Sequence, residues 1–272
     1  KSCKIKNSLI MSKRTDSNAY TIIFAMIMVV VVGSLLAFFS SFLKPNIDEN
    51  KRVEKQQNIL YAMGINDNDE SNANFISSSF AGQEFSKFVK EQLVLEVTDE
   101  KVTKLQTREE YMDTNNGQEP YLIDVKQQQN HAKEGKARKL PLFVGEKDGK
   151  TFYVAPIYGK GLWDAIWGYV SLDENMVIQG AYFDHKGETP GLGANIKQRY
   201  FMDDFIGEYL LTDEGDFKGV TVAKGNNDPK NERKTDYKVD AIAGATITGD
   251  GVTAMIKSDL QLYVPYFKSL KN

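Results

Sequence analysis

The sequence is short of the residues that hold inorganic cofactors. Its 272 residues include one cysteine, Cys3, and two histidines, His131 and His185. An internal disulfide, a cysteine-ligated iron–sulfur cluster and a CxxCH haem site are therefore excluded within this chain. Two histidines are too few for an independent zinc or di-iron cage. We expect no metal site here, and the composition favours an organic cofactor or redox centres supplied by partner subunits.

An excess of positive charge is also missing. The chain has 34 Lys and Arg against 37 Asp and Glu, a net charge of -3. Without a basic field, nucleic acid is not an expected partner. The length leaves room for one sizeable domain together with a membrane anchor and a stalk.

Charge is absent altogether from Tyr20 to Leu43. At ~1.5 Å per residue this segment spans roughly 36 Å as a helix, enough for a hydrocarbon core of ~30 Å with some tilt. A cleavable signal peptide has a shorter apolar region, of ~7–15 residues, and ends in a small-x-small site, so it fits less well. We predict a transmembrane helix over residues 20–43.

The charges that flank this span favour one orientation. Lys13 and Arg14 precede it, opposed by Asp16, whereas the charges that follow it are mixed. The positive-inside tendency therefore places residues 1–19 in the cytoplasm and the bulk of the chain outside it.

Residues 44–139 are expected to form a stalk and an α/β excursion. Pro45 is expected to end the transmembrane helix, after which Ile47 to Met63 shows an imperfect helical stripe stopped by Gly64. Residues 75–104 are expected to hold a helix and then a short strand around 93–97. The polar stretch 113–139 is predicted to be a surface excursion.

From residue 140 the pattern is typical of hairpins. Two strands, 140–144 and 151–157, flank the turn Glu-Lys-Asp-Gly-Lys, and strands 165–172 and 177–183 flank a second turn. A short strand over 219–223 and a C-terminal helix over 251–270 follow, and Pro265 must interrupt or kink that helix. These elements predict an α+β fold: one N-terminal transmembrane helix, then an extracytoplasmic twisted antiparallel sheet packed with helices, with its functional domain at 140–272.

Three short stretches rich in small residues stand out from this background. None contains a Walker A loop or the GxGxxG dinucleotide fingerprint, so binding of a pyridine nucleotide to this chain is disfavoured. The stretches are Gly159-Lys160-Gly161-Leu162-Trp163, Gly187-Glu188-Thr189-Pro190-Gly191-Leu192-Gly193 and Asp240-Ala241-Ile242-Ala243-Gly244-Ala245-Thr246-Ile247-Thr248.

The third stretch leads into the C-terminal helix. Gly244 and Ala245 leave the Thr246 hydroxyl uncrowded, and the helix that follows offers unpaired N–H groups to an anion such as a phosphate. Taken alone, the loop favours a threonine that simply caps the helix.

Together the three stretches resemble a known family. Asp-x-x-x-Gly-Ala-Thr-x-Thr resembles the attachment motif of FMN-binding domains in which a flavin transferase esterifies the FMN phosphate to threonine. Glu-Thr-Pro-Gly-Leu-Gly is similar to a second motif of the same domain family. Gly-Lys-Gly-Leu-Trp narrows the resemblance to the C-type subunit of the sodium-translocating NADH:quinone reductases. The resemblance covers most of residues 11–272.

The resemblance implies that Thr246 carries FMN as a covalent phosphoester, with Thr248 as the second choice of acceptor. Thr248 is otherwise expected at the N-cap of the helix. Asp240 is expected to position the loop or to help the transferase hold its metal. One departure exists: the family usually has Ser or Thr where this chain has Ala243.

The other cofactor-binding residues expected from the resemblance have competing structural interpretations. Trp163 walls the isoalloxazine or anchors the core, and Gly191 either lets backbone amides approach the flavin or serves the Pro190-Gly191 turn. Glu188 and Thr189 either bond the ribityl chain or pyrimidine edge of the flavin or cap local backbone. His185 is expected as an exposed strand-end residue. The complete expected set is Leu162, Trp163, Glu188, Thr189, Gly191, Leu192, Gly193, Asp240, Gly244, Ala245, Thr246 and Thr248.

The resemblance also implies a function. Within a membrane translocase, NADH is oxidised on another subunit, and electrons pass through FAD and iron–sulfur centres to this FMN. They continue to a second covalent FMN and quinone as sodium ions are exported. The chain relays electrons without turnover of its own. Its partners are the other subunits, a flavin transferase and membrane lipid, and its location is the bacterial inner membrane with the main domain periplasmic.

Two alternatives remain open at this point. One is the flavin subunit of the related ferredoxin:NAD oxidoreductase complex, which the Gly-Lys-Gly-Leu-Trp stretch and the long insert at 66–139 disfavour. The other is a non-redox periplasmic assembly module, for which Ala243 is the supporting feature.

Overall fold

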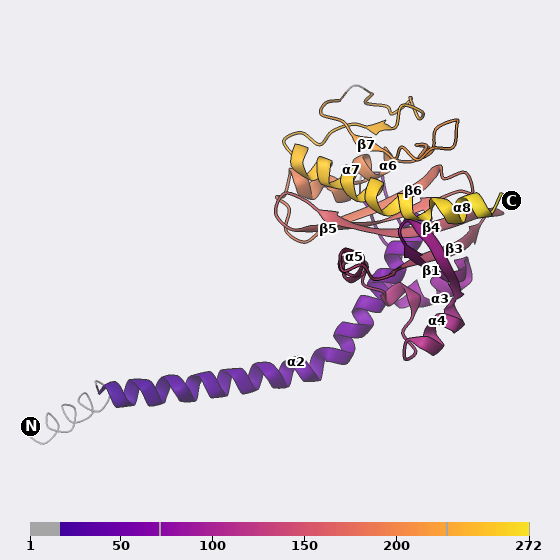
Figure 1. Ribbon diagram of the computed structural model, residues 1–272. Coiled ribbons are helices and arrows are strands. Elements are labelled where there is room, and N and C mark those ends of the chain that lie inside the picture. The colour runs from indigo at the N-terminus through magenta and orange to yellow at the C-terminus, as the bar shows by residue number, and fades with distance from the viewer. Residues whose placement is uncertain (1–16, 71, 227, 272) are drawn as a thin grey trace, which may run out of the picture. The chain divides into compact units, whose positions relative to one another are not determined.

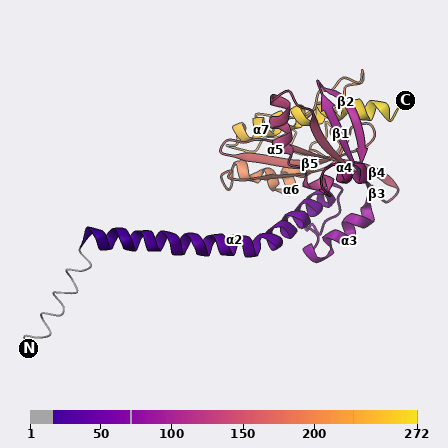
Figure 2. The same ribbon diagram turned by 60° about the horizontal axis from the view of Figure 1, so that its bottom comes forward.

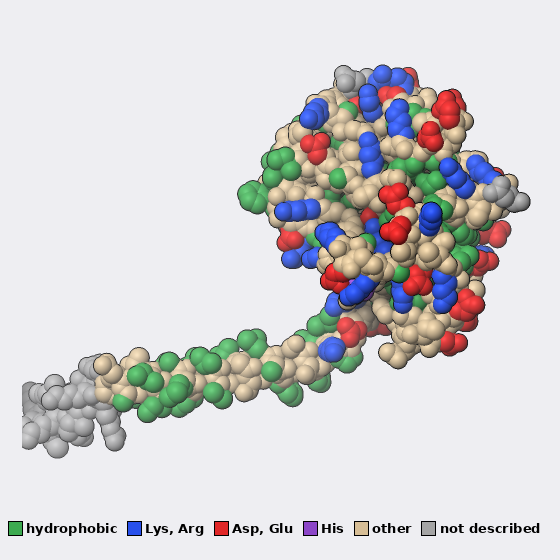
Figure 3. Space-filling model, viewed as in Figure 1, with side chains coloured by type: hydrophobic (Ala, Val, Ile, Leu, Met, Phe, Trp, Pro, Cys, Tyr) green, Lys and Arg blue, Asp and Glu red, His purple; other side chains and the backbone are tan. Residues whose placement is uncertain are grey.

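The computed structural model describes residues 17–70, 72–226 and 228–271 and divides into two units. The first unit ends at Lys51, and the second runs from Arg52 to Asn272. The described part of the first unit is the N-terminal part of helix α2 (Asn18–Ala62). This helix contains an 18-residue window of mean hydropathy 2.9 in which no residue is buried. Hydrophobic side chains follow one another along it (Figure 3). Among the described residues it is the one helix long and apolar enough to cross a membrane.

The prediction that Pro45 ends this helix is wrong. Helix α2 continues through Pro45 to Ala62, so the predicted span and the predicted stalk are one helix. A proline removes one backbone hydrogen bond, but the turns on either side keep theirs. The last turns are further stabilised within the second unit, where Ile59 and Leu60 are fully buried. Gly64, with φ +70°, follows the end of the helix as predicted.

The second unit is built on a six-stranded antiparallel sheet in the order β2-β1-β3-β4-β5-β6. The predicted α+β class with an antiparallel sheet and an apolar N-terminal helix is therefore confirmed. The strands are β1 (Val89–Thr98), β2 (Lys101–Thr107), β3 (Arg138–Lys147), β4 (Lys150–Lys160), β5 (Ala165–Leu172) and β6 (Ile178–His185).

A short parallel pair and several helices complete this unit. The pair consists of β7 (Thr221–Val222) and β8 (Lys238–Val239). The helices are α3 (Ser78–Phe88), α4 (Arg108–Thr114), η1 (Pro120–Leu122), α5 (Val125–Lys133), η2 (Gly193–Lys197), α6 (Arg199–Asp203), α7 (Thr246–Leu260), η3 (Gln261–Tyr263) and α8 (Val264–Ser269).

Helices cover both faces of the sheet. On one face α7 and α8 run across the strands (Figure 1), and a Cβ on Gly159 of β4 would come 2.7 Å from Cβ of Met255 in α7. Tyr182 of β6 lies on the other face, because strand residues alternate between faces. There its ring is 5.6 Å from that of Tyr61 at the end of α2. Figure 2 shows the sheet between these two helical layers.

Both predicted hairpins are present. Asp148 (φ 53°) and Gly149 (φ 73°) form a two-residue loop between the paired residues Lys147 and Lys150, as a type I′ turn requires. The second hairpin joins β5 to β6, with a register shift at Ser171.

Three features differ from expectation in the region before residue 140. Strand β1 is longer than predicted and pairs with β3, so the sheet continues across the boundary expected at 139–140. Strand β2 was not predicted. The stretch 113–139 is not wholly a surface excursion, because α5 packs against β3 and β4 and buries Gln128.

The C-terminal helix also starts earlier than predicted, at Thr246 instead of residue 251. Pro265 lies in the first turn of α8, where a missing N–H costs little, and the break in the helix falls at η3.

Candidate functional site

Thr246 is the first residue of α7. The turn before it closes through a hydrogen bond from the Ala245 N–H to the Ile242 carbonyl at 3.0 Å. Gly244 has φ +72°, and a Cβ there would come 2.8 Å from Cδ2 of Leu192, so glycine fits both the backbone and the space. The Thr246 side chain is exposed. Its hydroxyl is thus accessible beside the N–H groups of the first helical turn, which have no intrahelical acceptors.

Thr248 lies in the same turn but faces the interior. Its side chain is 1% exposed, and Oγ1 donates a 2.6 Å hydrogen bond to Oε2 of Glu188. The expectation that Thr248 is the N-cap is wrong: the helix begins two residues earlier and Ala245 is the N-cap, with no side-chain cap bond.

The Glu188 carboxylate joins the three stretches into one site. It is buried and accepts hydrogen bonds from the Thr248 hydroxyl and from the Trp163 backbone N–H at 2.9 Å. Burial acts to raise the pKa of this carboxyl, but the hydrogen bonds outweigh it and hold the pKa below its usual range. The carboxylate therefore binds neighbouring backbone, as the local role expected of Glu188 requires.

Two glycines make room for this carboxylate. A Cβ on Gly161 would come 2.6 Å from Oε1 of Glu188. A Cβ on Gly193 would come 2.5 Å from both Oε2 of Glu188 and Oγ1 of Thr248. Real Cβ atoms essentially never come this close to another atom, so a side chain at either position would displace the Glu188 carboxylate, whereas glycine leaves it in place.

Gly191 has a different local role. The Leu192 N–H donates to the Thr189 carbonyl at 3.1 Å, and Gly191 has φ +78° after Pro190. This arrangement is a type II turn, which needs glycine at its third position.

Leu162 and Trp163 lie at the surface beside this turn. Trp163 is 66% exposed, so it is not a core anchor. Its indole N–H donates to the Thr189 hydroxyl at 3.2 Å, which fixes the ring over the turn. An exposed indole with a satisfied N–H offers an apolar face to a flat partner.

A cavity of about 240 Å³ opens beside Thr246. Nine of the twelve residues expected to bind the cofactor line it, and Ile247, which was not expected, lines it as well. This volume is below the ~300–1,000 Å³ of a typical small-molecule pocket, so a bound flavin would remain partly at the surface. The lining residues are Leu162, Glu188, Thr189, Leu192, Gly193, Gly244, Ala245, Thr246, Ile247 and Thr248.

Three expected residues do not line this cavity: Trp163 and Gly191, which lie in its neighbouring loops, and Asp240. Oδ1 of Asp240 accepts from the Asp228 N–H at 3.3 Å, and Asp240 borders two other hollows on the β7–β8 side of the unit. Ala243 is exposed and lies two residues before the N-cap, so the hydroxyl usual in the family would not stand at the N-cap position itself.

His185 was expected to be exposed and is instead half-buried at the end of β6. Its Nδ1 accepts a hydrogen bond from the Glu188 N–H at 3.2 Å. The ring therefore supports the turn that carries Glu188.

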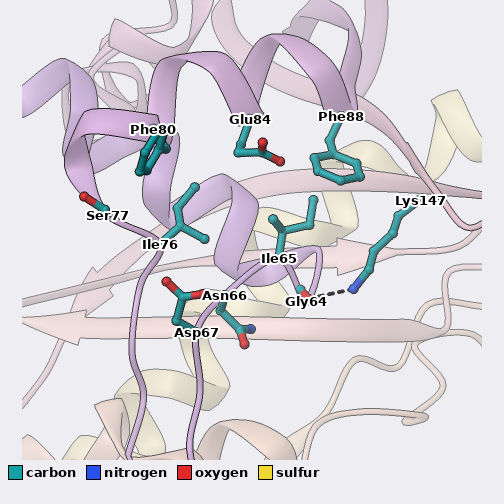
Figure 4. A pocket seen from close by; sticks show the side chains of 10 residues that line it. All are labelled: Gly64, Ile65, Asn66, Asp67, Ile76, Ser77, Phe80, Glu84, Phe88 and Lys147. Atoms are coloured by element: carbon teal, nitrogen blue, oxygen red, sulfur yellow. Dashed lines mark hydrogen bonds between the residues drawn. The ribbon is translucent and has the colours of Figure 1, made fainter.

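A larger cavity, of about 510 Å³, lies between the end of α2, helix α3 and the β3–β4 turn (Figure 4). Its walls are mainly apolar, and Lys147 Nζ donates to the Gly64 carbonyl at 2.7 Å. This contact satisfies a carbonyl at the C-terminal end of α2. None of the residues expected to bind the cofactor lines this cavity.

Comparisons with known proteins agree with this geometry. Residues 161–261 match the family model described as an FMN-binding domain. This range includes Gly161 to Trp163 of the first stretch and the whole of the other two stretches. The chain is 26% identical to the C-type subunit of the Na(+)-translocating NADH-quinone reductase of Pseudomonas aeruginosa, over 89% of this chain and 90% of that one. It is 27% identical to the corresponding subunit from Neisseria meningitidis serogroup B, over 96% and 98%.

Two solved structures are also similar. The crystal structure of the C-type subunit of the Na(+)-translocating NADH-quinone reductase from Parabacteroides distasonis matches with a TM-score of 0.65 and 30% identity, covering 83% of this chain and 96% of that one. The structure of Shewanella oneidensis NqrC matches with a TM-score of 0.58 and 26% identity, over 82% and 98%.

Proposed function

Because this chain belongs to the NqrC family, the C-type subunits of the Na(+)-translocating NADH-quinone reductases, we propose that it carries one FMN, esterified through its phosphate to Thr246, as an electron relay. Bound FMN supplies the chemistry of accepting and donating electrons. The chain holds the flavin and sets its surroundings, and it does not turn over a substrate alone.

The observation that carries this proposal is the position of the Thr246 hydroxyl. It is exposed at the start of α7, above a cavity walled by the other two motif loops. The N–H groups of the first turn and the positive end of the helix dipole favour a phosphate at this place. A phosphoester on Thr246 therefore puts the phosphate next to its natural binding groups.

The surrounding residues suit the rest of the cofactor. Leu162, Leu192 and Ile247 are 41–57% exposed and line the cavity, so they offer apolar contact to a ring and exclude water from it. The small cavity leaves one edge of the cofactor open to the surface. An open edge suits a relay that passes electrons to another centre.

Membership of the family supports the rest of the expected function. We propose that the chain works with the other subunits of a complex that oxidises NADH, reduces quinone and exports sodium ions. The apolar part of α2 anchors it in the bacterial inner membrane, with Lys13 and Arg14 on the cytoplasmic side and the second unit in the periplasm. A flavin transferase attaches the FMN.

Denaturing electrophoresis tests the proposal. The protein is expressed in membranes with a flavin transferase, and the gel is viewed under ultraviolet light. We expect a fluorescent band for the parent chain and none for Thr246→Ala at equal protein loading. A parent band without fluorescence would contradict the proposal and favour a non-redox assembly module.

A further inference from the structure

Two hydroxyls separated by one residue have opposite environments. Thr246 Oγ1 is exposed, whereas Thr248 is 1% exposed and donates to Glu188 at 2.6 Å. Both threonines line the same cavity. Something in the site must direct a flavin to one of them, provided that the chain is flavinylated as proposed above.

The attachment reaction defines what that selection requires. A phosphoester bond forms between a threonine Oγ1 and the flavin phosphorus. An activated donor, a flavin pyrophosphate, supplies this phosphorus: its P–O–P bond breaks and a nucleoside monophosphate leaves with the electron pair. The hydroxyl proton passes to a base on the transferase, and no electron is gained or lost. The acceptor oxygen must therefore be reachable by a bulky, anionic phosphorus centre.

By hydrogen bonding alone, Thr248 is the better nucleophile, because a hydroxyl paired with a carboxylate is the usual arrangement for activation. The surroundings of Thr248 nevertheless disfavour its use as the nucleophile. The hydroxyl is buried, and the hydrogen bonds that lower the pKa of Glu188 make its carboxylate a weak base. The negative charge of that carboxylate also repels an approaching phosphate, strongly so where little water screens it.

We propose that Glu188 is the specificity-determining residue of flavin attachment, which holds the Thr248 hydroxyl inward and repels the flavin phosphate from the cavity floor. The phosphate then lies at the N-terminus of α7, beside Thr246. Gly161 and Gly193 serve the same selection, because any side chain there would displace the carboxylate. Glu188 acts through position and charge and forms no bond to the flavin.

The test maps the flavin in cells that express the transferase. Trypsin is expected to release Val239–Lys257, which carries both threonines, and fragment ions then place the flavin. In Thr246→Ala we expect no flavin on this peptide. In Thr246→Ala with Glu188→Gln, which keeps the shape and removes the charge, we expect a signal from Thr248-linked flavin at least tenfold above the background signal of Thr246→Ala alone.

A matched control distinguishes an effect of Glu188 on the choice of threonine from a general destabilisation of the fold. Glu208 is fully buried and does not line this cavity, so Thr246→Ala with Glu208→Gln should show no flavin on Thr248. The proposal is overturned if Thr248-linked flavin does not rise in the Thr246→Ala, Glu188→Gln double variant while Glu188→Gln alone is still flavinylated at Thr246. If Glu188→Gln does not fold, Thr246→Ala with Glu188→Asp, whose shorter side chain gives up the 2.6 Å contact, decides by the same readout. A parent chain without flavin would instead refute the proposed function.

Discussion

The hydroxyl of Thr248 donates to Oε2 of Glu188 across sixty residues of sequence. The same carboxylate accepts from the Trp163 backbone, so one buried side chain ties together the three stretches that stood out in the sequence. The motifs are therefore parts of one packed structure, and their glycines serve that packing as much as any cofactor.

This packing predicts that alanine substitutions at two glycines of the same stretch, Gly193 and Gly187, lower the free energy of unfolding by different amounts. Gly193→Ala should lower the free energy of unfolding by ~1–3 kcal/mol, because its Cβ overlaps Glu188 and Thr248. Gly187→Ala is the control, since its Cβ would meet Asp164 at an ordinary 3.7 Å. It should change stability by less than ~0.5 kcal/mol. Urea unfolding of the two variants measures the difference, and equal costs would show that the carboxylate tolerates displacement.

Glu208 predicts a pH dependence. Its side chain is fully buried, and burial, the largest effect, raises its pKa to about 8; the charged and polar groups that also act on it are Lys234, Asp236, Asn231 and Asp228. The pKa of Glu208 in the folded state exceeds its unfolded value of ~4.3, so between these two values the folded state keeps a proton that the unfolded state has lost. The stability that this proton contributes to the folded state is therefore lost as pH rises from ~4.3 to about 8.

Glu208→Gln cannot lose this proton. Between pH 5 and pH 8.5 the variant should therefore gain stability relative to the parent chain by at least ~1 kcal/mol. Urea unfolding at both pH values measures it. A constant difference between the two proteins would mean that Glu208 is ionised in the folded state across this range.

The end of α2 predicts where the chain can be cut. Residues 52–272 should fold and stay soluble without detergent, because the apolar window is removed and the buried turns are kept. Residues 65–272 should not fold, since Ile59, Leu60 and Tyr61 are 0–4% exposed. Losing three such side chains costs several kcal/mol, comparable to the whole stability of a domain. Circular dichroism and sedimentation of both fragments check this, and a folded 65–272 fragment would show that the sheet stands without α2.

Local signals in the sequence predicted much of this fold. Asp148-Gly149 between two apolar runs predicts a hairpin because few residues accept two positive φ angles. Strand β2 was missed because its residues are mostly polar and exposed, with Gln106 the buried one. Helix α5 was missed for the same reason, since Gln128 is its one buried residue. Their structure comes from packing against β1, β3 and β4, which no local pattern records.

The site was predicted as a set of residues but not as an arrangement. Family motifs identified nine residues that line the cavity beside Thr246. The inward position of Thr248 could not be read from its spacing, because the first residue of α7 lacks a conventional cap signal: Ala245 is the N-cap. The partner of Glu188 lies sixty residues away, so the contact exists only once the fold brings α7 over β4 and β5.

The orientation in the membrane is a further prediction. The charges before the span predict that the region after Pro45 lies outside the cytoplasm. Protease added to intact spheroplasts should cleave this region, as it cleaves a periplasmic control protein. Full protection of the second unit while the control is cleaved would reverse the assignment.

The most direct test of the central claim is the position of the flavin in the mature protein. Peptide mass spectrometry of the parent chain, purified from cells with a flavin transferase, should place one FMN on Thr246 of the Val239–Lys257 peptide. Thr248→Ala should keep that flavin, although it loses the bond to Glu188 and ~1–3 kcal/mol of stability. Flavin on Thr248 in the parent, or flavin retained on this peptide in Thr246→Ala, would contradict the account.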